Sequence, residues 1–367
     1  RKRSPHTFLS PTTQRSRTDD FFKFGGEGSW EIDFWGRIDR SIESADASLE
    51  ASTEDYRDVL VVLYAEVSTN YVEVRALQDR IKYVRGNIET MRKSLQLTKD
   101  RFDAGLAPDL DVQQAELNLA RTESTLPTLE MLLVQTINRL GVLLGEHPSA
   151  LHDELVKPAS IPNPSESITV GLPVELLRQR PDIRQAEREL AAQTARIGVA
   201  KADLYPTFSL FGTFEIGAND FSDVLSYSKS RMHSFGPSFR WNIFDGGRVR
   251  NQIRAEDART EQALVRYEQT VLDALEDVEN AMISYIQEEV RRNALERSVK
   301  AARKSTDLVR TLYISGLTDF QNVQEMERFQ FEQEDQFAES EGKVIQNLIS
   351  VYRSLGGGWN PGVKIHE

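Results

Sequence analysis

The feature that most restricts the fold is a proline-free stretch from Asp39 to Phe102, in which apolar or small residues recur with helical spacing. From Val74 onward the spacing alternates between three and four, the heptad pattern of helices that share a packed seam. The recurring positions are Ile42, Ala45, Leu49, Tyr56, Val59, Leu63, Val67, Val74, Leu77, Ile81, Val84, Ile88, Met91, Leu95 and Phe102. One helix over this stretch is about 95 Å long. It therefore needs a coiled coil or a helical tube, and a soluble coiled-coil rod is one such solution.

The long helix is expected to turn back at Gly105. The segment 103–108 places this glycine where a left-handed residue commonly ends a helix, and its proline prevents continuation. A second helix is predicted from about Asp109 to Leu144, with Pro127 as a kink. Residues 145–170 are rich in proline and serine and are predicted to form a connection. The sequence thus predicts a long antiparallel helical hairpin.

The same pattern occurs twice, because the two halves of the sequence align without a gap over a long span. The repeat predicts a second long helix over about 248–313, a tip at 315–319 and a return helix ending near Leu355. Matched positions include Trp30 with Trp241, Ile32 with Ile243, Gly105 with Gly316, Leu106 with Leu317 and Glu116 with Glu327. A helix at 182–203 and a strand at 205–217 have no counterpart in the first half. The chain is therefore expected to begin near the end of its first strand.

Three segments alternate apolar and polar residues, which predicts strands with one apolar face. The apolar sets are Phe22, Phe24, Trp30, Ile32 and Phe34, then Phe208, Leu210, Phe214 and Ile216, then Phe235, Phe239, Trp241 and Ile243. Aromatic residues near the strand ends (Trp30, Phe34, Trp241 and Phe244) suit the interfacial girdle of a membrane protein. The alternative is the core of a soluble β-layer.

Composition excludes several classes of function. The net charge of −12 argues against a nucleic-acid partner, and the absence of cysteine removes disulfides and thiolate chemistry. No apolar run is long enough for a transmembrane helix. The strands of a β-barrel would not be detected by hydropathy, because their apolar and polar residues alternate. The five histidines are scattered, and no phosphate-binding loop or nucleophile elbow occurs. We therefore expect no enzymatic activity, no cofactor and no metal site.

One stretch carries a specific resemblance. Residues 171–187 read GLPVELLRQRPDIRQAE, and 197–206 read IGVAKADLYP. Arg180-Pro181-Asp182 opens a helix, because proline is favoured in the first turn and an acid suits the helix N-terminus. The ordered pair of segments closely resembles the signature of TolC-type outer-membrane factors, in the OprM/NodT-like efflux lipoprotein branch.

The resemblance implies an α+β membrane protein: a trimeric outer-membrane β-barrel with four strands per protomer, continued by a long α-helical periplasmic barrel, with internal duplication. Four strands cannot close a barrel alone, since eight is about the smallest number that closes. The expected parts are barrel strands and extracellular loops at 1–37 and 204–247, a first helical hairpin at 38–144, an equatorial connection and helix at 145–203, a second hairpin at 248–355 and a tail at 356–367.

The implied function is a passive exit duct in a tripartite efflux system, carrying drugs, metal ions or lipids that an inner-membrane pump supplies through a periplasmic adaptor. The implied location is the bacterial outer membrane, in contact with its lipid and reaching into the periplasm, with a lipid-bearing cysteine upstream of these residues. Two alternatives are a type I protein-secretion duct, against which the RPDI segment argues, and a soluble coiled-coil scaffold.

The resemblance also implies two sites. The hairpin tips Gly105-Leu106 and Gly316-Leu317 are expected to dock the adaptor, with Ala104 and Ser315 where the family usually has valine. The alternative is that each leucine packs inside its own turn. A periplasmic aperture is expected at Asp111, Tyr313, Asn322 and Glu325, where a charge is missing at Asn322. The alternative for these four is that they are solvated helix residues.

Overall fold

A computed structural model of the chain describes residues 22–162, 178–218 and 231–357. These residues divide into two compact units, one formed by 1–46 with 191–261 and the other by 47–190 with 262–367. The longest helices contribute residues to both units. Among the residues described, no helix combines the length and the apolarity needed to cross a lipid bilayer. Long helices and short strands are the two ingredients of this fold, as the sequence predicts.

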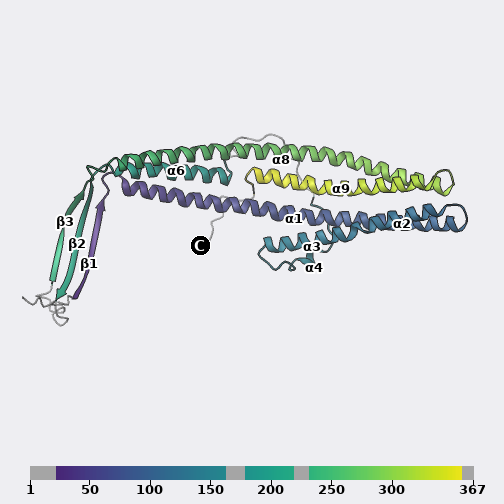
Figure 1. The fold of residues 1–367 in the computed structure, drawn as a ribbon, viewed down its shortest axis with the longest axis horizontal. Helices are drawn as coiled ribbons and strands as arrows, with labels where there is room; N and C mark the ends of the chain where they lie inside the picture. The colour runs from purple at the N-terminus through teal and green to yellow at the C-terminus, as the bar shows by residue number, and fades with distance from the viewer. Residues whose placement is uncertain (1–21, 163–177, 219–230, 358–367) are drawn as a thin grey trace, which may run out of the picture. The chain divides into compact units, whose positions relative to one another are not determined.

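The first unit contains an antiparallel sheet in the order β1-β2-β3 (Figure 1). The strands are β1 (Phe22–Ile32), β2 (Thr207–Ala218) and β3 (Arg231–Arg240). The register pairs Trp30 with Leu210 and Phe208 with Phe239. Residues paired in this way point to the same side of a sheet, so the predicted apolar residues of the three strands share one face.

Two strands end earlier than the alternating pattern predicts. Phe34 lies beyond β1, and Trp241 and Ile243 lie beyond β3. The reason at β1 is a helix cap: the Asp33 carboxylate accepts hydrogen bonds from the backbone N–H groups of Ile38 and Asp39, which starts the next helix. Alternation in the sequence therefore continues into the links, where the backbone no longer pairs.

The helical elements match the predicted hairpins closely. Helix α1 (Arg37–Asp103) is followed by α2 (Asp109–Glu123) and α3 (Thr125–Leu143), and α8 (Arg248–Ile314) is followed by α9 (Phe320–Ser354). The predicted kink at Pro127 is a break at Ser124, because proline disrupts the helical turn that precedes it. Helix α6 (Pro181–Ala202) is as predicted, whereas the short helix α4 (His152–Leu155) in the connection is not.

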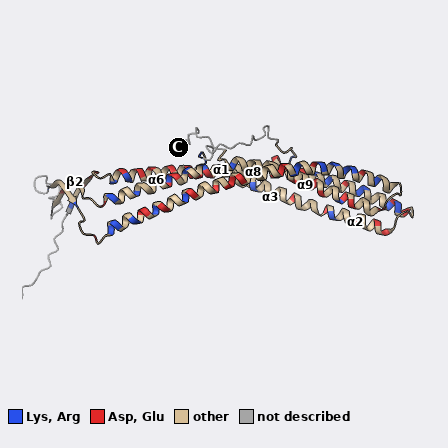
Figure 2. Ribbon diagram, turned by 90° about the horizontal axis from the view of Figure 1, so that it is seen from above, with Lys and Arg blue, Asp and Glu red and all other residues tan. Residues whose placement is uncertain are grey.

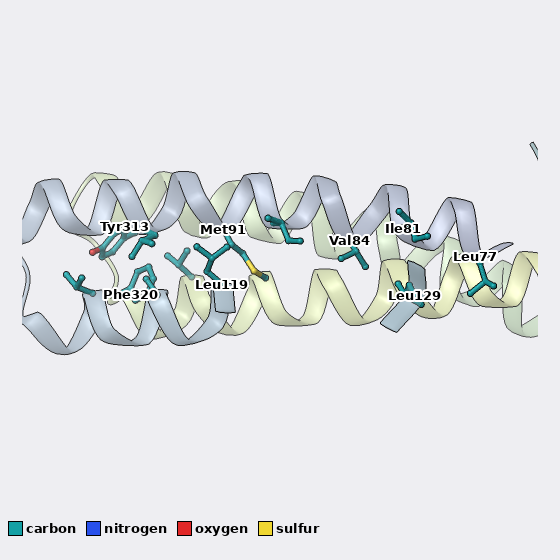
Figure 3. Close-up of a cluster of buried hydrophobic side chains, with 13 residues drawn as sticks. Leu77, Ile81, Val84, Met91, Leu119, Leu129, Tyr313 and Phe320 are labelled. Atoms are coloured by element: carbon teal, nitrogen blue, oxygen red, sulfur yellow. The ribbon is translucent and has the colours of Figure 1, made fainter. Parts of the chain in front are cut away.

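In the second unit, α9 lies beside both α1 and α8 (Figure 1). The predicted seam of α1 from Leu77 to Leu95 is buried there, together with residues of α2, α3, α8 and α9 (Figure 3). Gly342 of α9 allows a close approach to α1, since a Cβ on this residue would lie 2.7 Å from the Cβ of Ala76. The apolar seam is thus the core of the helical part.

The earlier half of the α1 pattern behaves differently. Ile42, Leu49, Tyr56 and Val59 are exposed, whereas Ala47, Ala51 and Val61 are buried. In the second unit, ion pairs from Glu50 and Glu54 of α1 to Arg188 and Arg184 tie this part to α6. The small side chains are thus covered in this part of α1, and the large apolar ones are exposed. Within the single chain the buried seam is therefore confined to the later part of α1, where the heptad spacing begins, and Phe102 at its far end is exposed.

Candidate functional site

The two hairpin tips have the same backbone conformation. Gly105 and Gly316 have φ angles of 71° and 72°, in the left-handed region that favours glycine. The Gly105 N–H bonds to the Phe102 carbonyl and the Leu106 N–H to the Arg101 carbonyl, and Gly316 and Leu317 repeat this pattern with Tyr313 and Leu312. These paired bonds form a Schellman motif, which satisfies the last carbonyls of the helix. The predicted geometric role of the two glycines is confirmed.

The two leucines at the tips are not used for packing within the chain. Leu106 and Leu317 are 68% and 74% exposed. A large apolar side chain in this position contributes no burial to the turn, so the alternative in which each leucine packs inside its own turn does not describe this structure. Each tip therefore presents an apolar side chain on a rigid, hydrogen-bonded turn.

The four aperture candidates have different surroundings within the chain. Tyr313 is 4% exposed and packs against Phe320, with the two ring centroids 5.4 Å apart (Figure 3). The Arg101 guanidinium carbon lies 4.7 Å from the centroid of the Tyr313 ring. Tyr313 is thus buried within the single chain, and its role at an aperture stays a prediction. Asn322 donates a hydrogen bond to the Thr318 hydroxyl at 2.8 Å.

The two acidic candidates have different surroundings. Burial raises the pKa of Asp111, the nearby Asp319 carboxylate raises it further, and Arg101 opposes both effects. Glu325 lies in a groove of about 360 Å³ between α2 and α9, lined also by Arg121 and Arg328. Asp111 thus belongs to the tip beside Arg101, whereas Glu325 belongs to a surface groove with cationic walls.

The signature arginine joins several helices in the second unit. The Arg180 guanidinium bonds to both oxygens of Asp182 (3.0 and 2.7 Å), to the Ser354 carbonyl at 2.8 Å and to Asp277 at 3.3 Å. These partners belong to α6, to the end of α9 and to α8. Arg180 packs against Gly356, where φ is 70° and a Cβ would lie 3.0 Å from the arginine Cα. The RPD segment therefore fastens the start of α6 to the end of the second hairpin.

Helix α9 buries acids that sequence analysis did not single out. Glu327 accepts hydrogen bonds from Arg310 of α8 (2.8 Å) and from the Ser94 hydroxyl of α1. One heptad away, Glu334 accepts bonds from Arg303 of α8 (2.6 Å) and Asn87 of α1 (2.9 Å). Both glutamates are 4% exposed. The seven-residue spacing of Glu327 and Glu334, matched on both partner helices, is the sequence signal that identifies this polar ladder.

The two faces of the sheet differ in polarity, although Arg231 and His233 share the apolar face by register and Phe211 lies on the opposite one. Among the residues expected to face lipid, Trp30, Ile32, Phe208, Leu210, Phe214 and Phe239 share the apolar face by register. On the opposite face, Lys23 pairs with Glu215, and the Ser209 and Ser238 hydroxyls lie 2.8 Å apart. Phe34, Trp241 and Ile243 belong to the links rather than to this face. On the apolar face, Trp30 and Phe239 are 65% and 72% exposed.

Neither the site nor its surroundings suggest catalysis. In the described ranges, no group of three or more His, Asp or Glu side chains is placed to hold a metal ion. Charges of both signs are distributed along the helices (Figure 2). What the structure does offer is a pair of apolar tips, a helix-joining arginine and a two-faced sheet.

Comparison with known proteins assigns these features to one family. The chain belongs to the outer membrane efflux protein family, whose model matches residues 7–146 and 172–357. It is 30% identical to Nodulation protein T of Rhizobium leguminosarum bv. trifolii over 92% of this chain and 72% of that protein. It is 31% identical to the pyoverdine export outer membrane protein OpmQ of Pseudomonas aeruginosa, over 93% of this chain and 71% of that one.

Solved structures agree with this assignment. The outer-membrane channel OprN superposes with a TM-score of 0.87 at 38% identity, over 94% of this chain and 82% of that one. CusC superposes with a TM-score of 0.84 at 26% identity, over 92% and 78%. The protein is therefore an outer-membrane channel of an efflux system, in a family of channels rather than enzymes. The family, the function as an efflux channel and the outer-membrane location implied by the signature are confirmed.

Proposed function

We propose that three copies of this chain form one continuous duct, with a β-barrel in the outer membrane and a helical tube in the periplasm. The observation that carries the proposal is the three-stranded sheet with one exposed apolar face. An open sheet leaves unpaired backbone groups at its edges, which lipid does not tolerate. With four strands per protomer, three copies supply enough strands to close a barrel.

The exposed apolar residues of the helices fit the same assembly. Large apolar side chains of α1, including Leu49 and Val59, and of α8, including Leu272 and Val290, are exposed in the single chain. Neighbouring copies in a tube cover such faces, as in other helical barrels that share seams. The barrel then comprises 1–37 and 204–247, the hairpins 38–144 and 248–355 form the tube, 145–203 forms the equatorial connection, and 356–367 is a tail.

The duct works as a passive conduit. An inner-membrane transporter supplies the energy, and a periplasmic adaptor joins it to the exposed leucines of the two tips. Asp111 and Glu325 supply negative charge near the periplasmic aperture. Relatives are described as serving pyoverdine export, cation efflux and solvent efflux. We accordingly assign small molecules as cargo. Identifying the partner transporter, for example from neighbouring genes, would give the class of small molecule.

The membrane assignment is tested on adjacent residues of β2 that point to opposite faces. Leu210→Arg places a charge on the lipid side and should cost about 2–4 kcal/mol near the midplane, whereas Ser209→Arg points to the lumen and should cost much less. The measurement is the midpoint of urea unfolding of the reconstituted protein. Equal tolerance of the two arginines contradicts the barrel.

The docking role is tested by changing Leu106 and Leu317 together to serine. Both side chains are exposed, so the purified channel should keep its thermal stability and subunit number. Export and cross-linking to the adaptor should be lost. The matched control is Ala104→Ser, a neighbouring tip residue without a large apolar side chain. Full export by the double variant contradicts docking, and loss of assembly assigns the leucines a structural role.

A further inference from the structure

The groove between α2 and α9 is lined mainly by polar side chains. These are Asn118 and Arg121 of α2 and Gln321, Gln324, Glu325 and Arg328 of α9. The four α9 residues occupy positions i, i+3, i+4 and i+7, so they share one face of the helix. The volume of about 360 Å³ lies within the range of small-molecule sites, roughly 300–1,000 Å³. The groove thus has the size of a ligand site and a lining that favours a polar ligand.

The two arginines of this groove have no acidic partner. Among the residues that the structure describes, neither Arg121 nor Arg328 forms an ion pair, although Glu325 lines the same groove. The Arg328 guanidinium carbon lies 5.3 Å from the centroid of the Phe329 ring. Two arginines against one glutamate leave an excess of positive charge in the groove. This excess is available to a ligand of the opposite sign.

The neighbouring seam between α1 and the return helices shows that unpaired cations are not general in this region. Along that seam, cations of α1 spaced seven residues apart each meet an acid of α2 or α3. The pairs are Arg85 with Glu130 at 2.8 Å, Arg92 with Glu123 at 2.7 Å and Lys99 with Glu116 at 3.7 Å. The chain as a whole has a net charge of −12, so acids are plentiful. The unpaired arginines are therefore a specific property of the α2–α9 groove.

The chemistry of the lining matches a carboxylate. A guanidinium presents paired N–H donors that fit the two oxygens of a carboxylate, and such charge-assisted bonds are stronger than neutral ones. The side-chain amides of Asn118 and Gln321 supply further donors and acceptors. The Gln324 amide donates a hydrogen bond to the Gln114 carbonyl at 3.4 Å, which holds one side of the groove. A small organic anion can thus bond to both walls at once.

The groove lies close to the hairpin tips, where α2 and α9 begin. Arg121 follows the start of α2 by about 18 Å along the helix axis, and Arg328 follows the start of α9 by about 12 Å. If Glu325 borders the duct entrance, the two arginines that share its groove border it as well. Charged side chains around a narrow passage raise the local concentration of ions of the opposite sign.

We propose that the α2–α9 groove binds a small organic anion through Arg121 and Arg328, and that carboxylate-bearing molecules are a cargo class of this duct. The proposal rests on the proposed function, because the groove meets cargo only if Glu325 borders the duct entrance. It adds the chemical class of the cargo and the residues that attract it.

The test measures ion currents through the full chain reconstituted in planar bilayers. The groove variant is Arg121→Gln with Arg328→Gln, which removes both positive charges and keeps polar side chains. Both arginines are exposed, so this variant should keep the subunit number and melting temperature of the parent. The matched control is Arg85→Gln with Arg92→Gln, which removes two arginines that are already paired with acids. Two quantities are recorded for each protein: the reversal potential in a KCl gradient and the citrate concentration that halves the current.

The proposal expects citrate to block the parent and the control at similar concentrations. The groove variant should need at least about tenfold more citrate, because the charge-assisted bonds of two guanidiniums are lost. Its reversal potential should also move toward potassium selectivity, while that of the control stays unchanged.

If the parent conducts but citrate does not block it, or blocks the groove variant equally well, the groove does not bind anions and the proposal is wrong, while the duct stands. Equal shifts in the groove variant and the control assign the effect to overall charge and also overturn the proposal. If the parent does not conduct at all, the duct itself fails, and the cargo assignment with it.

Discussion

The two helical hairpins descend from the same sequence pattern but are buried in different ways. In the first, the α1 seam packs through apolar side chains such as Val84, Ile88 and Met91. In the second, α9 buries Glu327 and Glu334 among cations and hydroxyl or amide groups. The repeat positions Glu116 and Glu327 show the contrast directly. Glu116 forms an exposed ion pair with Lys99 at 3.7 Å, whereas the carboxylate of Glu327 is 3% exposed.

The difference follows from what surrounds each return helix. Contacts of α9 reach α1 on one side, through Arg80 and Asp335, and α8 on the other, through Arg303 and Glu334. At the corresponding position of α2, Glu116 is exposed and remains hydrated. An acid that becomes buried must be paired, because an unpaired buried charge is costly. The comparison teaches that position in the assembly, rather than the repeated pattern, decides which charges carry stability.

The largest effect should come from the end of the second hairpin. Arg180→Met removes the bonds to Ser354, Asp182 and Asp277, and should lower the free energy of unfolding by about 3–5 kcal/mol because buried acceptors and acids lose their cation. The first hairpin ends at Gly145, which no such side chain contacts. Differential scanning calorimetry of the purified channel measures the change. Arg180→Lys keeps the positive charge but not the paired N–H donors of the guanidinium, and should recover only part of the lost free energy of unfolding. An Arg180→Met protein as stable as the parent contradicts the role of Arg180 in joining α6 to α8 and α9.

The next comparison uses the repeat-related acids Glu327 and Glu116. Glu327→Ala leaves Arg310 and Ser94 without their shared acceptor, and should destabilise the protein by about 2–4 kcal/mol. Glu116→Ala removes an exposed pair and should change stability by less than about 1 kcal/mol. Chemical unfolding of the two variants side by side gives the ratio. Similar losses of stability for the two variants would contradict the proposed difference between the hairpins.

Smaller changes in stability, opposite in sign to each other, are expected when two helical glycines are replaced by alanine. Gly342→Ala drives a methyl group into Ala76 and should cost about 1–3 kcal/mol through overpacking. Gly86→Ala is the control, because no atom lies within 4 Å of the added Cβ. It should stabilise α1 by roughly 0.5–1 kcal/mol, the usual gain of alanine over glycine in a helix. Shifts of the melting temperature in the same direction contradict the close contact of α9 with α1.

The smallest effect depends on pH. Burial raises the pKa of Glu341, and Asp79 and Glu296 add to the shift while Arg292 opposes it. A carboxyl with a raised folded pKa contributes stability that is full below its unfolded pKa and is lost as pH rises through the folded pKa. Glu341→Gln should therefore melt higher than the parent at neutral pH and converge with it near about pH 4.

The control for this pH experiment is Glu130→Gln at the matching repeat position. Glu130 pairs with Arg85 at 2.8 Å on the exposed surface, so its replacement should lower the melting temperature slightly or leave it unchanged. The sign of the difference between the two glutamine variants is the readout. A lower melting temperature for Glu341→Gln than for the parent at neutral pH would contradict this prediction, because it would show that the Glu341 carboxylate stabilises the parent.

Local pattern predicted much of this molecule. The seam from Leu77 to Leu95, the left-handed glycines at 105 and 316 and the alternating faces of β2 all follow from spacing and backbone preference. Such features depend only on residues close in sequence. The signature at Arg180 identified the family, and the structure supplied its role, since its partners Asp277 and Ser354 are distant in the chain.

The misses share one cause, which is dependence on distant partners. Ile42 and Val59 fit the helical spacing of α1 but are exposed within the single chain, and spacing alone does not reveal which helical face is covered. Trp241 and Ile243 continue the alternation of β3 after backbone pairing has ended. Tyr313 stays a predicted aperture residue, and its packing against Phe320 and Arg101 could not be inferred from spacing in the sequence. No rule of spacing distinguishes a surface tyrosine from a core tyrosine at a helix end.

The most direct test of the whole account is the number of chains in the working channel. Native mass spectrometry of the protein extracted in detergent, on a sample that also conducts ions in a planar bilayer, counts the copies in one particle. Strands pooled between protomers predict three chains and no conduction from smaller species. A conducting monomer or dimer would contradict the shared barrel.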